Sequence, residues 1–323
     1  GSGLPFNRLQ QLQTSLGVPL AASTQWDIVD DGANKVLFAW QELVRKAAQG
    51  AVLHNDDTTA KILSLIKENA QADPKRKGMF TSGILSEVDG HKIALFFTGR
   101  NHAGENLAHV LEQRQVKDPP IQMCDALSRN LPSDFVTLLA NCLVHARRNF
   151  VDVHASFPEQ CQFVIETLAD VYKNDHVAKQ RQMSPEERLA FHQTQSGPLM
   201  QQIDNWLQKQ LAEQKVEPNS GLGKAMAYMQ KHWQALTLFL QVPGAPMDNN
   251  ICEQVLKRAI LHRKNSLFFK TERGAFVGDL YMSLIHTCSL VNANAFDYLS
   301  AVLDHHDLVR ENPLDWMPWN FTA

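Results

Sequence analysis

The chain has 323 residues, of which 44% are hydrophobic and 20% charged, and a formal net charge of −3. This is the composition of a globular protein with one large domain or two ordinary ones. The charge excludes a molecule that is basic overall, so any nucleic acid would have to be bound by local patches. Five scattered cysteines favour a reducing compartment over a disulfide scaffold. No stretch has the pattern of a membrane span or a secretory leader, so we expect a cytoplasmic protein.

Residues 4–48 are expected to form a helical lead-in. Apolar residues from Phe6 to Leu16 recur at helical spacing, and Gly17-Val18-Pro19 breaks the pattern. A second apolar series, between Trp26 and Val44, predicts two further helices. The short apolar run 51–54 is followed by Asn55-Asp56-Asp57, which predicts a buried strand that ends at these polar residues.

Residues 49–153 carry the signals of a mixed sheet. Residues 79–88 and 91–98 are strand-like and are joined by Asp89-Gly90, a strong hairpin signal. A helix is predicted near 105–112, and a strand over 121–125 ends in Asp125. The order of strands and helices predicts an α/β arrangement.

Residues 154–245 change in character, since strand signals vanish and helical periodicity dominates. Ser184-Pro185-Glu186-Glu187 is typical of a helix start. We interpret this stretch as an all-helical insertion. Residues 246–304 then return to the core with a helix over 249–263, and residues 305–323 are expected to be an irregular tail.

The run after Glu253 has the strongest functional signal. It contains several cations and no acidic residue before Glu272: Lys257, Arg258, Arg263, Lys264 and Lys270. A carboxylate at the start of a helix, beside dense positive charge, suits a site that holds a metal ion and a phosphate backbone together.

Three acids fall at predicted element boundaries: Asp56, Asp125 and Glu253. If they converge, their oxygens would bind two Mg²⁺ ions, with Mn²⁺ as a substitute, roughly 4 Å apart. Each acid also has a structural interpretation. Asp56 suits a helix cap, Asp125 suits a turn, and Glu253 lies at capping-box spacing from Asn250. Spacing alone selects none of them.

Cys142 and His145 form a Cys-x-x-His pair. A structural zinc ion needs about four ligands, and no second close pair exists, so packing and hydrogen bonding are favoured. Arg147 and Arg148 suit either a solvated helix face or phosphate contact. The aromatic residues Phe268, Phe269, Trp316 and Trp319 are interpreted as core or tail anchors, with stacking on an unpaired base as the less favoured alternative.

Several segments, in order, resemble one family. They are LHNDDTT at 53–59, CLVHARRNF at 142–150, SPEERLAFHQTQSGPLMQQIDNWL at 184–207, DNNICEQVLKRAILHRKNSLFF at 248–269, LIHTCSLVNANAFDYLSAVL at 284–303 and MPWN at 317–320. They are similar to the insertion-sequence-66 family of bacterial transposases, over residues 5 to 320.

The resemblance implies an RNase H-like mixed sheet with flanking helices, interrupted by a large all-helical insertion. It implies an Asp-Asp-Glu triad of Asp56, Asp125 and Glu253, with His145 beside it. The implied reaction is Mg²⁺-dependent hydrolysis at transposon ends, followed by attack of the 3′-hydroxyl on target DNA. The implied partners are double-stranded DNA and further copies of the chain, at the bacterial nucleoid. Six residues would hold the DNA backbone: Arg147, Arg148, Lys257, Arg258, Arg263 and Lys264.

The chain departs from the family pattern at two acids. Asp57 stands where the family usually has Glu, which makes Asp57 a rival ligand. Ala126-Leu127-Ser128 follows Asp125 where a Gly-Tyr segment is usual. The N-terminal DNA-binding region common in the family is expected to be missing. An alternative is therefore a catalytically inactive, transposase-derived DNA-binding protein, and the Gln-rich helices at 193–214 suit a dimer interface.

Overall fold

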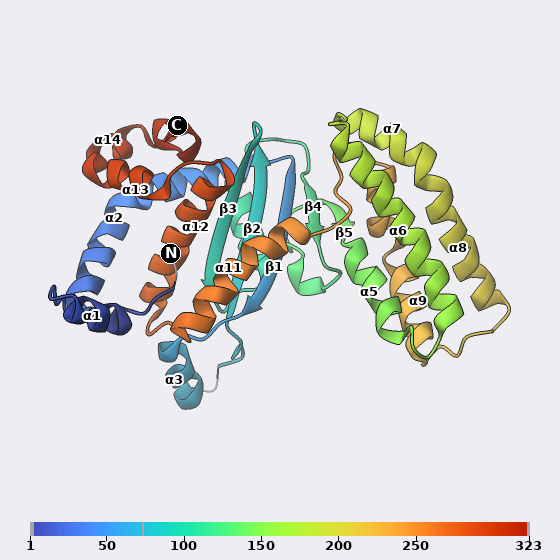
Figure 1. Cartoon of the computed structure of the whole chain (residues 1–323), viewed down its shortest axis with the longest axis horizontal. Helices are drawn as coiled ribbons and strands as arrows, with labels where there is room; N and C mark the ends of the chain where they lie inside the picture. The colour runs from blue at the N-terminus through green and yellow to red at the C-terminus, as the bar shows by residue number, and fades with distance from the viewer. Residues whose placement is uncertain (1–2, 73, 322–323) are drawn as a thin grey trace. The chain divides into compact units, whose positions relative to one another are not determined.

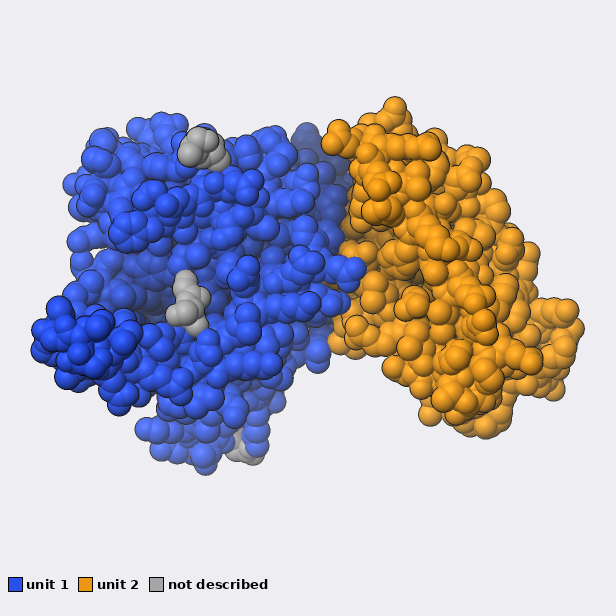
Figure 2. All heavy atoms as spheres, viewed as in Figure 1, with its two compact units in different colours: residues 1–120, 128–136, 250–323 blue, residues 121–127, 137–249 orange. Residues whose placement is uncertain are grey.

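A computed structural model of the chain describes residues 3–72 and 74–321. The architecture is mixed α/β, as the sequence predicts (Figure 1). Its strands form both antiparallel and parallel pairs. The chain divides into two compact units (Figure 2). Unit 1 comprises residues 1–120, 128–136 and 250–323, and unit 2 comprises residues 121–127 and 137–249.

Three antiparallel strands form the sheet of unit 1: β1 (Val52–Thr59), β2 (Phe80–Val88) and β3 (His91–Gly99). The strand β2 lies between the other two. Asp89 and Gly90 both have positive φ, 52° and 78°, as a tight hairpin turn between β2 and β3 requires. The predicted hairpin is therefore confirmed.

The strand β1 is longer than the sequence predicts. Its pairing with β2 continues from Val52 opposite Glu87 to Thr59 opposite Phe80. The expectation that Asp56 lies at the end of a strand is therefore wrong, since Asp56 lies within β1. The reason is that a ladder of backbone hydrogen bonds depends on the partner strand, and it tolerates polar side chains that a sequence pattern reads as a strand end.

Eight helices complete the described part of unit 1. They are α1 (Phe6–Ser15), α2 (Ala22–Ala47), α3 (Leu63–Ala72), α4 (Ala103–Leu111), α11 (Asn250–Ser266), α12 (Glu272–Leu290), α13 (Ala295–Asp304) and α14 (His306–Glu311). Two differences from expectation follow. The helix α2 is continuous where two helices were predicted. The tail contains α14 and short 3₁₀ turns over 313–316 and 318–321, because its aromatic residues pack on the main core.

The two faces of the sheet in unit 1 are covered by different helices, because successive strand residues point to opposite faces. On one face Leu53, Ile84 and Leu95 belong to the main core, together with residues of α2 and α4. On the other face Leu85 and Phe96 pack against α11. Figure 1 shows α11 running across the strands. The face that α11 covers is the one that carries Asp56.

The edge of β3 is covered by side chains of α12. Backbone N–H groups of Ala94, Phe96 and Thr98 donate to Thr287 Oγ1 (3.1 Å), Ser283 Oγ (3.0 Å) and Asp279 Oδ2 (2.5 Å). Four helix residues rise about 6 Å and two strand residues about 6.7 Å, so the two series stay in step. Such cover protects an edge strand from pairing with another chain. Burial raises the pKa of the Asp279 carboxyl to about 7.

Unit 2 contains the parallel pair β4 (Ile121–Cys124) and β5 (Leu138–Asn141), with Ile121 opposite Leu138. Its helices are α5 (Leu143–Val153), α6 (Pro158–Gln180), α7 (Pro185–Gln195), α8 (Gly197–Ala212), α9 (Gly221–Lys231) and α10 (Trp233–Leu236). Every regular element between residues 154 and 245 is helical. The Ser184 hydroxyl accepts from the N–H of Glu187, and the Glu187 carboxylate accepts from the N–H of Ser184, which confirms the predicted helix start.

A buried ionic network joins α6 to α7 in unit 2. The side chain of Asp175 is 4% exposed. It accepts hydrogen bonds from Arg188 (2.8 Å) and from His192 (3.3 Å), and it pairs with Lys179 at 2.7 Å. Arg188 also donates to the carbonyl of Ala245 (3.0 Å). The network therefore holds the irregular segment that leads toward α11 against the helices of unit 2.

None of the helices in residues 3–72 and 74–321 is long and apolar enough to cross a bilayer.

Candidate functional site

The two neighbouring acids of β1 lie on opposite faces of the sheet. Asp56 is paired with Gly83 of β2, and Asp57 is paired with Ser82. Directly opposed residues of antiparallel strands share a face. Asp56 therefore shares the face of Gly83, which α11 covers, and Asp57 shares the face of Ser82, which α4 covers through a hydrogen bond from Asn106 (2.8 Å).

The Asp57 side chain is buried on the α4 face, where it contacts His102 and Arg129. Its side chain is 1% exposed, 2.8 Å from His102 Nδ1 and 3.4 Å from Arg129. His102 precedes α4, and its backbone N–H donates to Glu105 (2.9 Å). Neither His102 nor Arg129 is among the site residues predicted from the sequence. The His-x-x-Glu spacing at 102–105 was the available signal for His102, since it resembles a capping box. Asp57 is therefore a buried acid in contact with two basic side chains, and its role as a rival metal ligand stays a prediction.

The first turn of α11 lies over the strand position opposite Asp56. Cys252 Sγ donates to the carbonyl of Gly83 (3.5 Å). A methyl group added at Gly83 would lie 3.0 Å from Leu256 Cγ, so the absence of a side chain there permits the close approach. Glu253 belongs to this first turn, and its Oε1 is buried. The fold thus places Asp56 and the turn that carries Glu253 on one face of unit 1.

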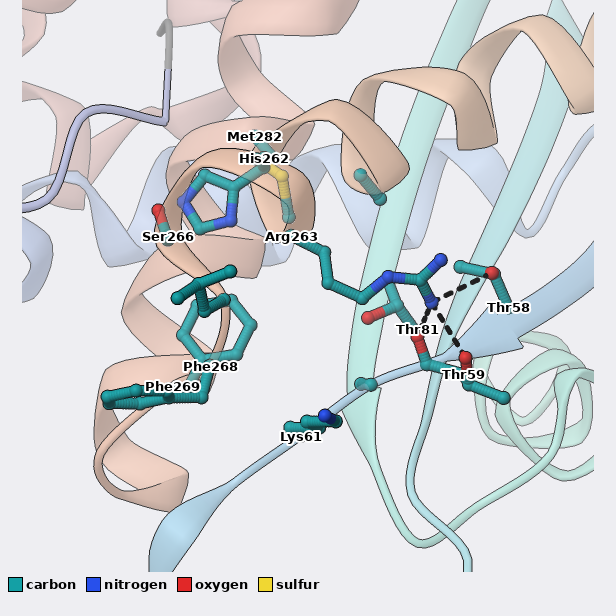
Figure 3. A pocket seen from close by; sticks show the side chains of 13 residues that line it. Thr58, Thr59, Lys61, Thr81, His262, Arg263, Ser266, Phe268, Phe269 and Met282 are labelled. Atoms are coloured by element: carbon teal, nitrogen blue, oxygen red, sulfur yellow. Dashed lines mark hydrogen bonds between the residues drawn. The ribbon is translucent and has the colours of Figure 1, made fainter.

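The other end of α11 is tied to β1 by Arg263 (Figure 3). The Arg263 guanidinium donates to Thr58 Oγ1 (3.2 Å), to Thr59 Oγ1 (2.8 Å) and to the carbonyl of Thr59. The adjoining cavity has a volume of about 10 Å³, the size that one water needs. Arg263 therefore positions the helix that carries Glu253, and contact with DNA stays a prediction for it. Lys257, Arg258 and Lys264 are exposed on α11.

Asp125 directly follows β4 in unit 2. Its Oδ1 accepts from the N–H of Leu127 (3.4 Å). This contact matches the structural interpretation of Asp125 as a turn residue. Burial and the charge of Asp125 both raise the pKa of Tyr228 on α9, to about 12, so Tyr228 lies within electrostatic reach of Asp125. Asp125 is partly exposed.

Cys142 holds the segment that precedes α11. The N–H of Asn249 donates to Cys142 Sγ (3.3 Å), and the N–H of Leu143 donates to the carbonyl of Met247 (3.0 Å). Cys142 is fully buried, and burial raises the pKa of its thiol. The packing interpretation of Cys142 is confirmed. His145 lies in the first turn of α5, where its N–H donates to the carbonyl of Cys142 (3.2 Å).

The two arginines of α5 differ in environment. Arg148 is exposed, whereas Arg147 is half-buried. Burial raises the pKa of Tyr172 on α6, and the positive charge of Arg147 opposes that rise, so Arg147 lies within electrostatic reach of Tyr172. Arg148 is the freer of the two to reach a phosphate.

Across residues 3–72 and 74–321, no group of three or more His, Cys, Asp or Glu side chains is arranged to hold a metal ion. Asp56 and Glu253 belong to unit 1, and Asp125 belongs to unit 2. All three are carboxylates, the donors that hard divalent ions prefer. Binding of Mg²⁺ by these acids stays a prediction.

One comparison with known proteins shows the family. The family model described as "Transposase IS66 family" matches residues 1–276. Three relatives come from Sinorhizobium fredii (strain NBRC 101917 / NGR234), and each is described only as an uncharacterized protein. The chain is 34% identical to y4jD over 57% of its length, 28% identical to y4hP over 99%, and 27% identical to y4qI over 57%.

The chain spans 36%, 60% and 34% of the lengths of these three relatives. No solved structure matches the chain.

Proposed function

Because the chain belongs to the IS66 family of transposases, we propose that it is the catalytic part of a DNA transposase with an RNase H-like core. Its substrate would be double-stranded DNA at transposon ends, followed by target DNA. The reaction would be hydrolysis of a phosphodiester at the transposon end. The freed 3′-hydroxyl would then attack a phosphodiester of target DNA, whose own 3′-oxygen leaves. The observation that carries the proposal is the shared face of Asp56 and the first turn of α11, in a chain of this family.

Asp56, Asp125 and Glu253 would hold Mg²⁺, which supplies activation of the attacking oxygen and stabilisation of the leaving oxygen. Other residues of the chain would hold the helix that carries Glu253 in place. Cys142 and Leu143 hold the segment before Glu253, and Arg263 holds the far end of the same helix. The proposed role of His145 is to orient a phosphate or a water beside the acids.

The cations would supply the sequence-independent part of DNA binding. Lys257, Arg258 and Lys264 are exposed along α11, and Arg148 is exposed on α5. Lysine and arginine that contact phosphates release condensed counterions, so their contribution weakens as salt rises. The proposed partners also include further copies of the chain, for which the exposed Gln-rich positions of α8 are candidates.

Metal binding tests the site directly. We expect Mn²⁺ or Mg²⁺ to bind the chain in calorimetry and the binding to be lost in Asp125→Asn, because the variant removes one of three carboxylate ligands. Asp134→Asn, an exposed acid outside the proposed triad, is the matched control and should bind as the parent does. If the parent binds no metal even when a DNA end is present, the inactive DNA-binding descendant becomes the better description.

DNA binding tests the arginines of α5. The double substitution Arg147→Ala and Arg148→Ala should weaken duplex binding and reduce the slope of log K against log salt by about 1 to 2, since each lost phosphate contact removes about 0.9. Fluorescence anisotropy over a salt series measures both quantities. The control is Lys209→Ala on α8, outside the proposed DNA-binding set. An unchanged slope in the double variant would return both arginines to a structural role.

A further inference from the structure

A cavity of about 860 Å³ in unit 1 lies outside the proposed catalytic site. It is lined by the start of α1, by the first turns of α2, and by the stretch that runs from the end of α11 into α12. Cavities of roughly 300–1,000 Å³ are the usual size for small organic ligands and cofactors. The size therefore suits a single nucleoside, and it excludes a duplex.

The lining combines aromatic rings with positive charge. Four of its rings are Trp26, Phe268, Phe269 and Tyr281. Arg8 and Lys270 also line the cavity, and none of its lining residues is acidic. Aromatic faces stack on bases of any sequence, and flanking cations track the phosphates of a single strand. This charge complementarity favours a polyanion with flat rings as the occupant.

One of these rings, Phe268, lies in the loop between α11 and α12 and is partly exposed to solvent. Leu267 has φ of 68°, a left-handed conformation that costs free energy for a residue with a branched side chain and that is concentrated at functional sites. The next residue, Phe268, is 45% exposed. Beside it, Phe269 is already stacked on His262, with ring centroids 5.4 Å apart and planes 17° apart. Phe268 is therefore a cavity-lining ring that is partly accessible to solvent.

We propose that this cavity binds an unpaired base of single-stranded DNA, with the base stacked on Phe268 and the neighbouring phosphates near Lys270 and Arg8. The proposal rests on the proposed function for the identity of the nucleic acid. It assigns the chain a second DNA contact, for the frayed or displaced strand that processing of a DNA end exposes.

The test is metal-free binding of a short fluorescein-labelled oligothymidylate, compared with a labelled duplex of equal length. Phe268→Ala should weaken binding of the single strand by about 10-fold or more, as loss of a stacked base does, and leave duplex binding unchanged. The matched control is Phe296→Ala, an exposed phenylalanine on α13 that is 77% accessible and does not line the cavity. It should bind both probes as the parent does.

Lys270→Ala should weaken the single-strand complex and lower its salt slope by about 0.7, whereas Phe268→Ala should leave the slope unchanged. Thermal melting of each variant verifies that it is folded. Equal loss of both probes in Phe268→Ala, or parent-like binding of the single strand, would overturn the proposal. So would a change in self-association by sedimentation without a change in oligonucleotide binding, since the occupant would then be protein. Because no metal or cleavage is involved, this outcome is independent of whether the carboxylates catalyse hydrolysis.

Discussion

Glu253→Gln should reduce cleavage of a transposon end by about 100-fold or more, to below detection in an ordinary gel assay, while duplex binding stays close to that of the parent. The substitution keeps the size of the side chain and removes its charge, so it removes a ligand that a divalent ion needs. Glu253 Oε1 is buried, and the first turn of α11, which carries Glu253, lies over the face of the sheet that carries Asp56. DNA binding should survive because the exposed cations of α11 and α5 are untouched.

The matched control is Glu272→Gln, which alters an exposed acid in the first turn of the next helix. Cleavage by that variant should equal cleavage by the parent. Anisotropy with labelled duplex and a thermal melt should be run on both variants, so that loss of cleavage is separated from loss of folding. Full cleavage by Glu253→Gln would remove Glu253 from the site.

Asp175→Asn should destabilise the protein by about 3 kcal/mol at neutral pH. The substitution leaves Arg188, whose side chain is only 18% exposed, without its anionic partner. Lys179 is 65% exposed and stays solvated. Removal of one partner from a buried ion pair typically costs about 3–5 kcal/mol, because the remaining charge is left poorly solvated. Urea unfolding followed by tryptophan fluorescence measures the change.

The pH dependence of this loss has a definite sign. Burial alone would raise the pKa of Asp175, but hydrogen bonds from His192 and Lys179 and the charge of Arg188 outweigh it and hold the pKa well below its ordinary 3.8. A carboxyl with a depressed pKa in the folded state contributes stability above its unfolded pKa and loses it as the pH falls through the folded value. The difference between Asp175→Asn and the parent should therefore narrow below about pH 4.

The control for Asp175 lies on the same helix. Asp170 pairs with Lys173 at 2.7 Å, and both side chains are more than half exposed. Solvent screens such a pair, so Asp170→Asn should leave the urea midpoint where it is. A midpoint for Asp175→Asn that equals the control would show that the network contributes little, whatever its geometry.

The sequence predicted local structure well wherever one short pattern decides it. The Asp89-Gly90 turn and the Ser184 helix start are set by residues within four positions of one another, so no distant contact can override them easily. The helix expected over 249–263 was also predicted correctly, since α11 spans Asn250–Ser266. Membership of the family was also legible, because it rests on ordered motifs along the chain.

Tertiary structure decided what those motifs could not. The extent of β1 depends on its pairing with β2. The sequence pattern predicted that the strand ends near Asp56, whereas the paired strand continues for three more residues, to Thr59. The environments of Asp56 and Asp57 depend on which helix covers which face of the sheet. Adjacent acids look equivalent along a chain, whereas the alternation of a strand sends one toward α11 and the other into contact with His102 and Arg129.

The sequence by itself determined that this chain has an α/β core with a long helical stretch and that it carries acids and cations of the kind a DNA-processing site needs. Only the tertiary structure decided which contacts these side chains make. Arg263 is indistinguishable from its neighbours in the basic run, but the helix ends beside β1 and its guanidinium meets Thr58 and Thr59 there. Residue type is local information, whereas the partner of a side chain depends on segments about 200 positions away, which only packing brings together.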